Sequence, residues 1–276
     1  MLENKDILRP GTVMAGERDV RDYLSSRSIP LPDSMRIMDF SPVARAVGDH
    51  FGGRISEGMG RYPPLVVEIP SRDFERISSS LGMSRSGIYS GSLSGLFIEG
   101  TNLILVPRDE MSIPGRADVI GYHEITHYAA SLAGGGPVFR TGLAETASPW
   151  FMEGLTEFFS SRIVGTTNSG GYPYETLSVL ALEAIVGRDE LRAAFSTNSF
   201  GSIARRVDAA LGEGAFTEFL SAPNGAAALR SLVRRDQRSP PAIGRSAVEG
   251  DPIWRELLGT ARLDDLLNPP SPSAPQ

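Results

Sequence analysis

Two short runs of apolar residues indicate where this chain forms β-structure. The run PLVVEI, residues 64–69, is rich in β-branched residues, and GLFIEGTNLILVP, residues 95–107, holds two apolar stretches separated by Gly100, Thr101 and Asn102. β-Branched residues favour strands, and a short polar insert that contains glycine is typical of a hairpin turn. The pattern therefore predicts one strand over 64–69 and a β-hairpin over 95–107.

Two longer helices are expected after the hairpin. The segment RADVIGYHEITHYAASLA starts at Arg116 and can run as one helix that ends at the glycines of residues 134–137. In SPWFMEGLTEFFSSRIVG, Ser148 suits the N-cap of a second helix, Pro149 suits its first turn, and Gly165 ends it. Shorter helices are expected near residues 17–27, 42–50, 175–186, 189–195, 201–211 and 214–235.

Composition divides the 276 residues into three parts. Residues 1–60 are rich in glycine, proline and charge and predict an N-terminal arm or small subdomain. Residues 61–235 carry the strands and the main helices, and are expected to form the principal domain. Residues 236–276, with SPP and NPPSPSAPQ, predict a peripheral or disordered tail in which PIWRELLG forms one short helix.

Charge and residue usage exclude several classes of protein. The formal net charge of −6 and the pI near 5.2 argue against a nucleic-acid partner, because neutralising phosphates calls for a basic surface. Cysteine is absent, which removes disulfides, thiolate ligands and cysteine nucleophiles. The first residues lack the apolar core of a secretory signal, and no run of eighteen apolar residues predicts a transmembrane segment. We expect a cytoplasmic protein by default, with export by a signal-independent route as the alternative.

The stretch GYHEITHYAA carries the most specific chemical signal in the chain. It contains two of the three histidines, His123 and His127, with Glu124 directly after the first. Residues four apart share one face of a helix, so both rings can point a nitrogen at a single ion, while Glu124 is turned about one hundred degrees away. This H-E-x-x-H spacing predicts one metal ion, expected to be zinc, with a base beside it; the alternative is a pair of ordinary helix histidines.

A catalytic zinc site needs a third protein ligand and an open fourth position. The metzincin continuation requires a glycine and a histidine three and six residues after His127, where this chain has Ala130 and Ala133. A cysteine ligand is excluded because there is no cysteine. The remaining common solution is a glutamate on a following segment.

Two glutamates compete for the third ligand position. Glu153 lies among the aromatic residues of PWFMEGLTEFF, whereas Glu145 lies in the expected loop RTGLAETASP. A carboxylate in an apolar helix is costly unless it pairs or binds a cation, and Glu157 lies one turn further on the same face. We therefore interpret Glu153 as the third ligand and Glu157 as an acceptor that orients a zinc-bound histidine, His123. Glu145 remains the alternative ligand, and solvation of both helix glutamates on an exposed face remains the alternative environment.

The sequence HEITH followed by WFMEGLTEFF resembles the gluzincin group of zinc metallopeptidases, which includes the thermolysin-like and aminopeptidase-like enzymes. The likeness covers roughly residues 64–190 and is specific at these two motifs. It implies an α+β, zincin-like catalytic domain, in which a small mixed β-sheet precedes an active-site helix and a mostly helical C-terminal part. It also implies that an edge strand, either Gly95 to Ile98 or Leu103 to Val106, binds the backbone of a substrate.

These residues together predict a zinc metallopeptidase acting on a peptide or protein substrate. Glu124 would serve as general base toward a zinc-activated water, and Tyr172 or Tyr174, in the loop after the second helix, would donate to the oxyanion. One alternative is a zinc-stabilised scaffold or inactive pseudo-peptidase that acts as a binding module. Another is a zinc hydrolase acting on a non-peptide bond. The sequence leaves the substrate, the cleavage specificity and the oligomeric state open.

Overall fold

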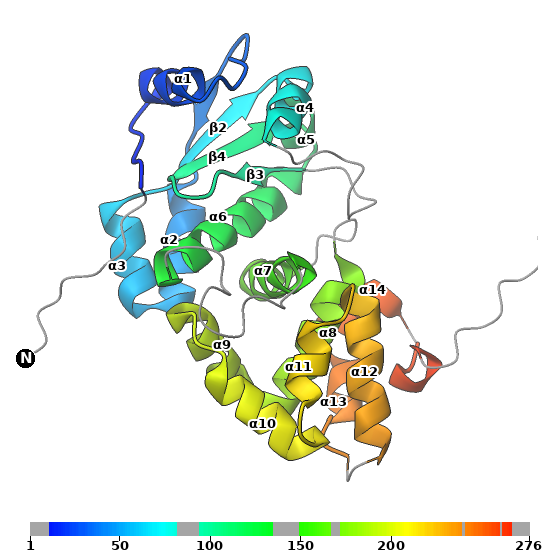
Figure 1. Ribbon diagram of the computed structural model, residues 1–276. Coiled ribbons are helices and arrows are strands. Elements are labelled where there is room, and N and C mark those ends of the chain that lie inside the picture. Colours follow the sequence, from blue (N-terminus) through cyan, green and yellow to red (C-terminus); the bar gives the residue numbers. More distant parts are fainter. Residues whose placement is uncertain are drawn as a thin grey trace, which may run out of the picture. The chain divides into compact units, whose positions relative to one another are not determined.

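The computed structural model describes residues 11–81, 94–134, 149–166, 172–238, 241–259 and 261–266. Within these ranges the protein is an α+β fold, mostly helical, with one four-stranded mixed sheet (Figure 1). The α+β prediction is confirmed at this level. The chain forms two compact units, Met1–Val138 with Arg162–Gly165, and Phe139–Ser161 with Thr166–Gln276. Division of the sequence at residues 60 and 235 stays a prediction.

The strands of the sheet are short and lie in the order β1-β2-β4-β3. The two central strands, β2 and β4, run parallel, and each flanking strand is antiparallel to its neighbour. The predicted strand at 64–69 and the predicted hairpin at 95–107 are both confirmed. Because β4 pairs on both sides, only β3 of the two proposed substrate-binding strands lies at an edge. The bounds are β1 Arg36–Met38, β2 Leu65–Ile69, β3 Leu96–Phe97 and β4 Leu103–Pro107.

Helices account for most of the described chain, and the two long helices expected after the hairpin are confirmed as α6 and α7. The first unit contains α1 Glu17–Ser26, α2 Ser41–Phe51, α3 Gly53–Arg61, α4 Ser71–Ser80, α5 Arg108–Met111 and α6 Arg116–Gly134. The remaining helices are α7 Pro149–Val164, α8 Pro173–Val186, α9 Arg188–Thr197, α10 Gly201–Leu211, α11 Ala215–Leu220, α12 Gly225–Arg238, α13 Arg245–Gly250, α14 Pro252–Leu258 and the 3₁₀ helix η1 Leu263–Leu266.

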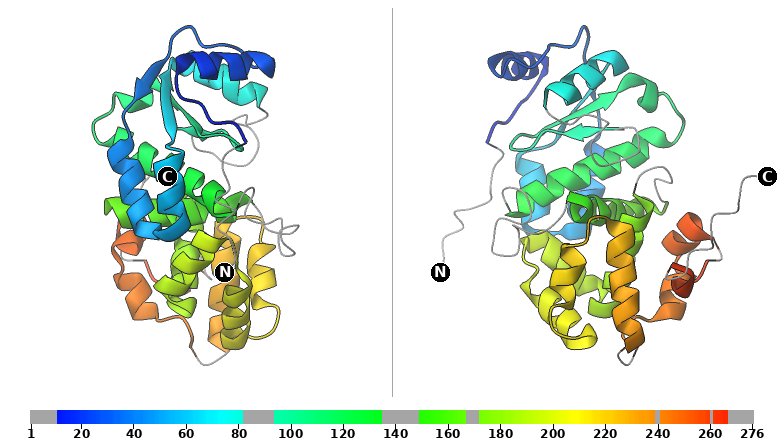
Figure 2. Two further views of the ribbon diagram at one scale, coloured as in Figure 1. Left: turned by 90° about the vertical axis from the view of Figure 1, so that its left-hand side faces the viewer. Right: turned by 45° about the vertical axis from the view of Figure 1, so that its right-hand side comes forward.

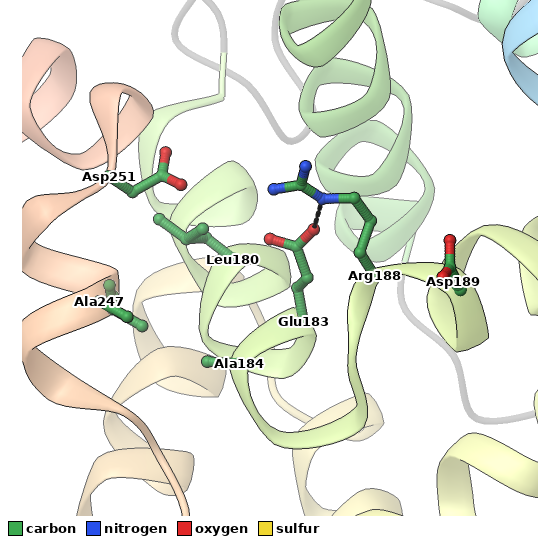
Figure 3. Close-up of a pocket in the computed structure, with 8 residues that line it drawn as sticks. Leu180, Glu183, Ala184, Arg188, Asp189, Ala247 and Asp251 are labelled. Carbon is green, nitrogen blue, oxygen red and sulfur yellow. Dashed lines mark hydrogen bonds and ion pairs between the residues drawn. The ribbon is translucent and has the colours of Figure 1, made fainter.

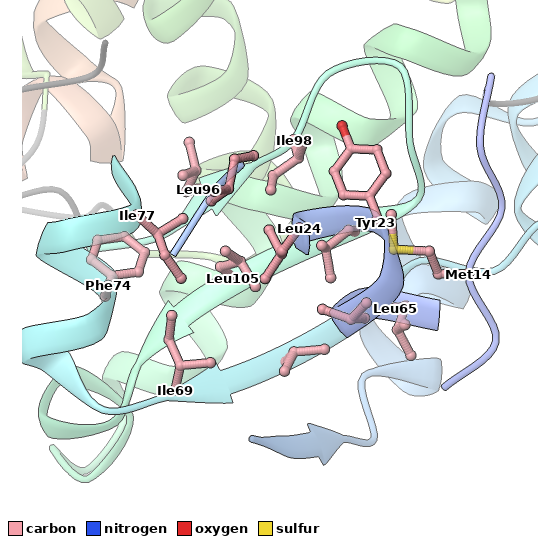
Figure 4. Packing of buried hydrophobic residues seen from close by; sticks show 14 residues of the cluster. Met14, Tyr23, Leu24, Leu65, Ile69, Phe74, Ile77, Leu96, Ile98 and Leu105 are labelled. Carbon is pink, nitrogen blue, oxygen red and sulfur yellow. The ribbon is translucent and has the colours of Figure 1, made fainter. Parts of the chain in front are cut away.

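One face of the sheet carries the hydrophobic core of the first unit. Alternate residues of a strand point to the same side, so Leu65, Val67 and Ile69 of β2 face one way together with Leu103 and Leu105 of β4. They pack against apolar side chains of α1 and α4 that cover this face (Figure 4). Helix α6 lies on the opposite face of the sheet, as the views in Figures 1 and 2 agree. The sheet is therefore buried between two layers of helix.

Close contacts fix α6 in its place within the first unit. A Cβ atom at Gly121 would lie 2.1 Å from Cε1 of Phe40, at the start of α2, so this turn of α6 requires glycine. On α3, a Cβ at Gly58 would lie 3.2 Å from Cδ1 of Leu132. The hydroxyl of Tyr128 donates to the carbonyl oxygen of Tyr62. Burial is the main cause that raises the pKa of Tyr128, and the nearby Tyr62 raises it further. These contacts set the rotation of α6 about its axis.

The second unit is built around α8. Its first turn lies close to two glycines: a Cβ at Gly154 of α7 would be 2.7 Å from the carbonyl oxygen of Glu175, and one at Gly225 of α12 would be 2.4 Å from the amide nitrogen of Glu175. The indole of Trp150 on α7 donates to the carbonyl oxygen of Ala222 at 2.8 Å. Small residues thus allow the backbones of α7, α8 and α12 to approach closely.

The helix expected over residues 214–235 is wrong as one element, because the structure has two. Helix α11 ends at Leu220, and α12 begins at Gly225 after a turn that contains Pro223. The side chain of Asn224 accepts from the amide of Ala227 at 2.9 Å, which caps α12. The short helix expected at PIWRELLG is confirmed as α14. Among the described residues, no helix is both long enough and apolar enough to cross a membrane.

Candidate metal centre

Helix α6 places the two histidines of the H-E-x-x-H sequence side by side. The Nε2 atoms of His123 and His127 lie 3.2 Å apart, and the ring centroids are 4.8 Å apart with an angle of 75° between the planes. This arrangement follows from their spacing, because residues four apart lie one above the other on a helix. His123 is buried, with 7% of its surface exposed, and His127 is half-buried.

Glu153 on α7 completes a group of three ligand side chains. One ring nitrogen of His123, one of His127 and one carboxylate oxygen of Glu153 all lie within 4.8 Å of one another. Zinc bonds of about 2.0–2.1 Å in a tetrahedral arrangement place ligand atoms about 3.4 Å apart, close to the separation of the two ring nitrogens. The same separation also fits a hydrogen bond between the two rings. The nearby carboxylate of Glu153 is what favours a metal site over such a hydrogen bond. The three residues form a cluster that could hold a metal ion.

Glu124 is directed to a different place from its histidine neighbours. Its carboxylate Oε2 accepts from the backbone amide of Phe97 at 2.9 Å, and the residue is 6% exposed. The next amide, that of Ile98, donates to the carbonyl oxygen of Leu103 on β4. Because amides alternate in direction along a strand, the Phe97 amide points to the side of β3 that faces away from β4. The carboxylate of Glu124 thus lies at the edge of the sheet, and Glu124 is not one of the three side chains of the cluster.

Glu157 lies one turn beyond Glu153 and is 2% exposed. Its carboxylate accepts from the hydroxyl of Ser161 at 3.3 Å. The alternative in which both helix glutamates are solvated is wrong, because Glu157 is buried and Glu153 is half-buried. The hydrogen bond expected from Glu157 to His123 stays a prediction.

The other sequence candidates have different positions. Tyr172 and Tyr174 lie at the N-terminus of α8; Tyr172 is half-buried, and Tyr174 has 39% of its surface exposed. Their role as oxyanion donors stays a prediction. Glu145 lies outside the described residues, so its competition with Glu153 also stays open. The third histidine, His50, lies on α2 and packs edge-on against Phe51.

Sequence reasoning missed two partners of Glu124 on the hairpin. The amide of Phe97 is a backbone group, and Gly95 contributes the absence of a side chain. Neither contact can be recognised from the residue types, because both depend on how the hairpin lies against α6. The glycine that opens the predicted strand was the only available signal, since glycine in such a place often permits close approach of another group.

A pocket of about 420 Å³ in the second unit presents a different kind of chemistry (Figure 3). Glu183 of α8 accepts from Nε of Arg188 at 2.8 Å, and the carboxylate of Asp251 also faces this pocket. The hydrogen bond to Glu183, together with the charge of Glu183, raises the pKa of Arg188. The chain itself supplies the cation here, so the pocket contains an ion pair and not a set of metal ligands.

Comparison of the chain with family models, with curated proteins and with solved structures found no match.

Proposed function

We propose that this protein is a zinc metallopeptidase with a zincin-like catalytic domain of the gluzincin kind. The observation that carries the proposal is the cluster of His123, His127 and Glu153. Two imidazoles and one carboxylate suit zinc, and three ligands from the described part of the chain leave the fourth tetrahedral position open for water or substrate. Structural zinc sites are usually closed by four protein ligands, so this ligand set favours catalysis over a zinc-stabilised scaffold.

Zinc bound by these residues would lower the pKa of a coordinated water to near neutrality. Glu124 accepts the proton of the attacking water as its oxygen adds to the carbonyl carbon of the peptide bond. Glu124 then delivers that proton to the amide nitrogen as the C–N bond breaks, which yields a carboxylic acid and an amine. Its position next to the histidines, with its carboxylate held at the edge of β3, supports this role.

The negative charge that develops on the carbonyl oxygen requires a hydrogen-bond donor from the protein. We assign this task to Tyr172 or Tyr174, whose hydroxyls can donate a hydrogen bond. Replacement of the acting tyrosine by phenylalanine should lower kcat by about 10²-fold, in the range measured for loss of an oxyanion donor. The phenylalanine variant of the other tyrosine is the matched control.

The substrate is expected to bind as an extended peptide along β3. In the described part of the chain this strand pairs only with β4, so its other side offers backbone groups to an added strand. The carbonyl of Phe97 points to this side together with its amide, because both groups of one residue point the same way in an antiparallel pair. The amide already donates to Glu124, so the carbonyl is the group that an added strand would bind. A peptide bound there would lie next to the carboxylate of Glu124.

Glu124→Gln tests the proposal most directly. The amide has the shape of the carboxylate but cannot accept the proton, so hydrolysis should fall by about 10²–10⁴-fold. Zinc content and the free energy of unfolding should change little. Profiling of cleavage sites in a peptide mixture gives the activity, and His50→Ala is the control because His50 lies outside the cluster. Full activity of Glu124→Gln would contradict the proposal. A zinc-loaded wild-type protein that cleaves no peptide would favour the scaffold or pseudo-peptidase alternative.

A further inference from the structure

We propose that strand β3 positions the general base, through the absent side chain of Gly95 and the backbone amide of Phe97. The inference rests on the proposed function, since it assigns a role in catalysis to the segment that precedes the strand. Gly95 and Phe97 do not touch the reacting atoms in this account. They act through Glu124 and are positioning residues.

The carboxylate of Glu124 occupies the space that a side chain at position 95 would need. A Cβ atom on Gly95 would lie 2.6 Å from both Cγ and Oε1 of Glu124, and 2.8 Å from Cδ. Ordinary contacts between such atoms are about 3.5–4.0 Å. Any residue other than glycine would therefore push the Glu124 side chain out of its observed position.

The backbone of Gly95 gives no other reason for glycine. The described glycines with positive φ do not include Gly95, so its backbone conformation is open to any L-residue. The close approach of Glu124 accounts for glycine here. Substitution of Gly95 by alanine therefore tests the position of Glu124 specifically, since it adds one methyl group directed at that side chain.

The amide of Phe97 fixes the second oxygen of the same carboxylate. It donates to Oε2 at 2.9 Å, whereas Oε1 lies over Gly95. The hydrogen bond holds Oε2, and the missing side chain of Gly95 leaves room for Oε1. The ring of Phe97 also packs edge-on against Tyr128, with 5.8 Å between ring centroids, which ties β3 to the same helix that carries His127. These two contacts hold β3 against the helix that carries Glu124.

Proton transfer depends steeply on this placement. A displacement of about 1 Å can lower the rate of a positioned reaction by about 10²-fold. Gly95→Ala should therefore lower kcat by about 10²-fold, change KM much less, and leave zinc content unchanged, because the added methyl group displaces the base while the metal ligands and the backbone groups of β3 are kept. The matched control is Gly60→Ala on the exposed side of α3, where an added Cβ meets no atom within 4 Å. This control should keep the wild-type kcat.

A double-mutant cycle tests the contact without any measurement of activity. Gly95→Ala should lower the denaturation midpoint of the wild-type protein, yet leave the midpoint of Glu124→Ala unchanged, because the colliding side chain is then gone. The inference is overturned if Gly95→Ala keeps the wild-type kcat, or if it lowers the midpoint equally in both backgrounds. Coupling between positions 95 and 124 in a protein without peptidase activity would instead contradict the proposed function and support the contact itself.

Discussion

Two carboxylates in this molecule, those of Glu68 and Glu153, have different kinds of nitrogen partner. On β2, Glu68 is 3% exposed and accepts from Arg36 at 2.5 Å and from Arg108 at 2.9 Å. On α7, Glu153 lies within 4.8 Å of ring nitrogens of His123 and His127. Arginine is charged at every ordinary pH, whereas an imidazole is mostly neutral at pH 7 and keeps a lone pair. The charge of Glu68 is therefore neutralised by two arginines of the chain itself. The imidazoles near Glu153 have lone pairs that could bind a cation.

Burial of an acid therefore says less about function than the chemistry of its partners. Asp236 is fully buried, but it accepts from the amides of Ala242 and Ile243 and pairs with Arg245. It fastens the chain after α12 to that helix. A guanidinium has no lone pair for a metal, so a carboxylate saturated in this way has a structural role. The histidine cluster differs in this property, although two of its members, His127 and Glu153, are only half-buried.

Zinc affinity should separate these two kinds of site most strongly. Glu153→Ala leaves two ligands and should remove most of the affinity, whereas Glu157→Ala should cost about 10–100-fold, as loss of a group that orients a ligand does. Glu145→Ala should leave the affinity unchanged. Titration with a competing chelator measures all three variants side by side. If Glu145→Ala strips the metal while Glu153→Ala keeps it, the ligand carried by α7 is wrong.

Glu68→Gln should affect stability and leave the metal site alone. The substitution removes the charge that binds Arg36 and Arg108, and loss of hydrogen bonds to a charged group costs about 1.5–3 kcal/mol. Both arginines are partly exposed and can regain water, which limits the loss. Urea unfolding measures the change, and the same zinc titration provides the control. A fall in zinc affinity would show that the two groups are not independent.

The smallest effect is expected at an exposed pair in the second unit. A hydrogen bond from Arg245 lowers the pKa of Asp264 below its usual value. A lowered pKa contributes stability above the unfolded-state pKa of about 3.9, and this stability is lost as pH falls through the lower folded-state pKa. Asp264 is 61% exposed, so the contribution should stay below about 1 kcal/mol.

Unfolding of Asp264→Asn, followed from neutral pH down to about pH 3, measures this contribution. The variant should be slightly less stable than wild type at neutral pH, and the difference should shrink as the medium becomes acidic. A difference that grows with acidity would contradict the sign of the pKa change. Zinc content should be the same in both proteins at neutral pH.

The parts of the fold that the sequence predicted correctly are those with a strong local pattern. The apolar runs gave β2 and the hairpin, and the glycines and prolines at the ends gave α6 and α7. Helix α3 was missed because its sequence, GRISEGMGR, contains three glycines, which weaken helix propensity. One of them, Gly58, lies against Leu132 of α6. Packing against a distant helix, rather than local preference, accounts for this element.

The candidate site divides in the same way. The spacing of His123 and His127 predicts their proximity, because helix geometry converts a separation of four residues into one shared face. The proximity of Glu153 to these histidines was predicted from the energetic cost of placing a carboxylate in an apolar helix. The contacts of Glu124 with Gly95 and Phe97 could not be predicted, because they depend on the position of the β3 edge relative to α6. Local periodicity carries no information on that position.

The metal content of the purified protein tests the central claim most directly. Wild type and His50→Ala should each carry close to one zinc ion per chain and lose it to a strong chelator, since His50 lies outside the cluster. His123→Ala and His127→Ala should carry almost none. Wild-type protein that contains no zinc and takes up none on titration would contradict the account, as would full zinc occupancy in either of these two variants.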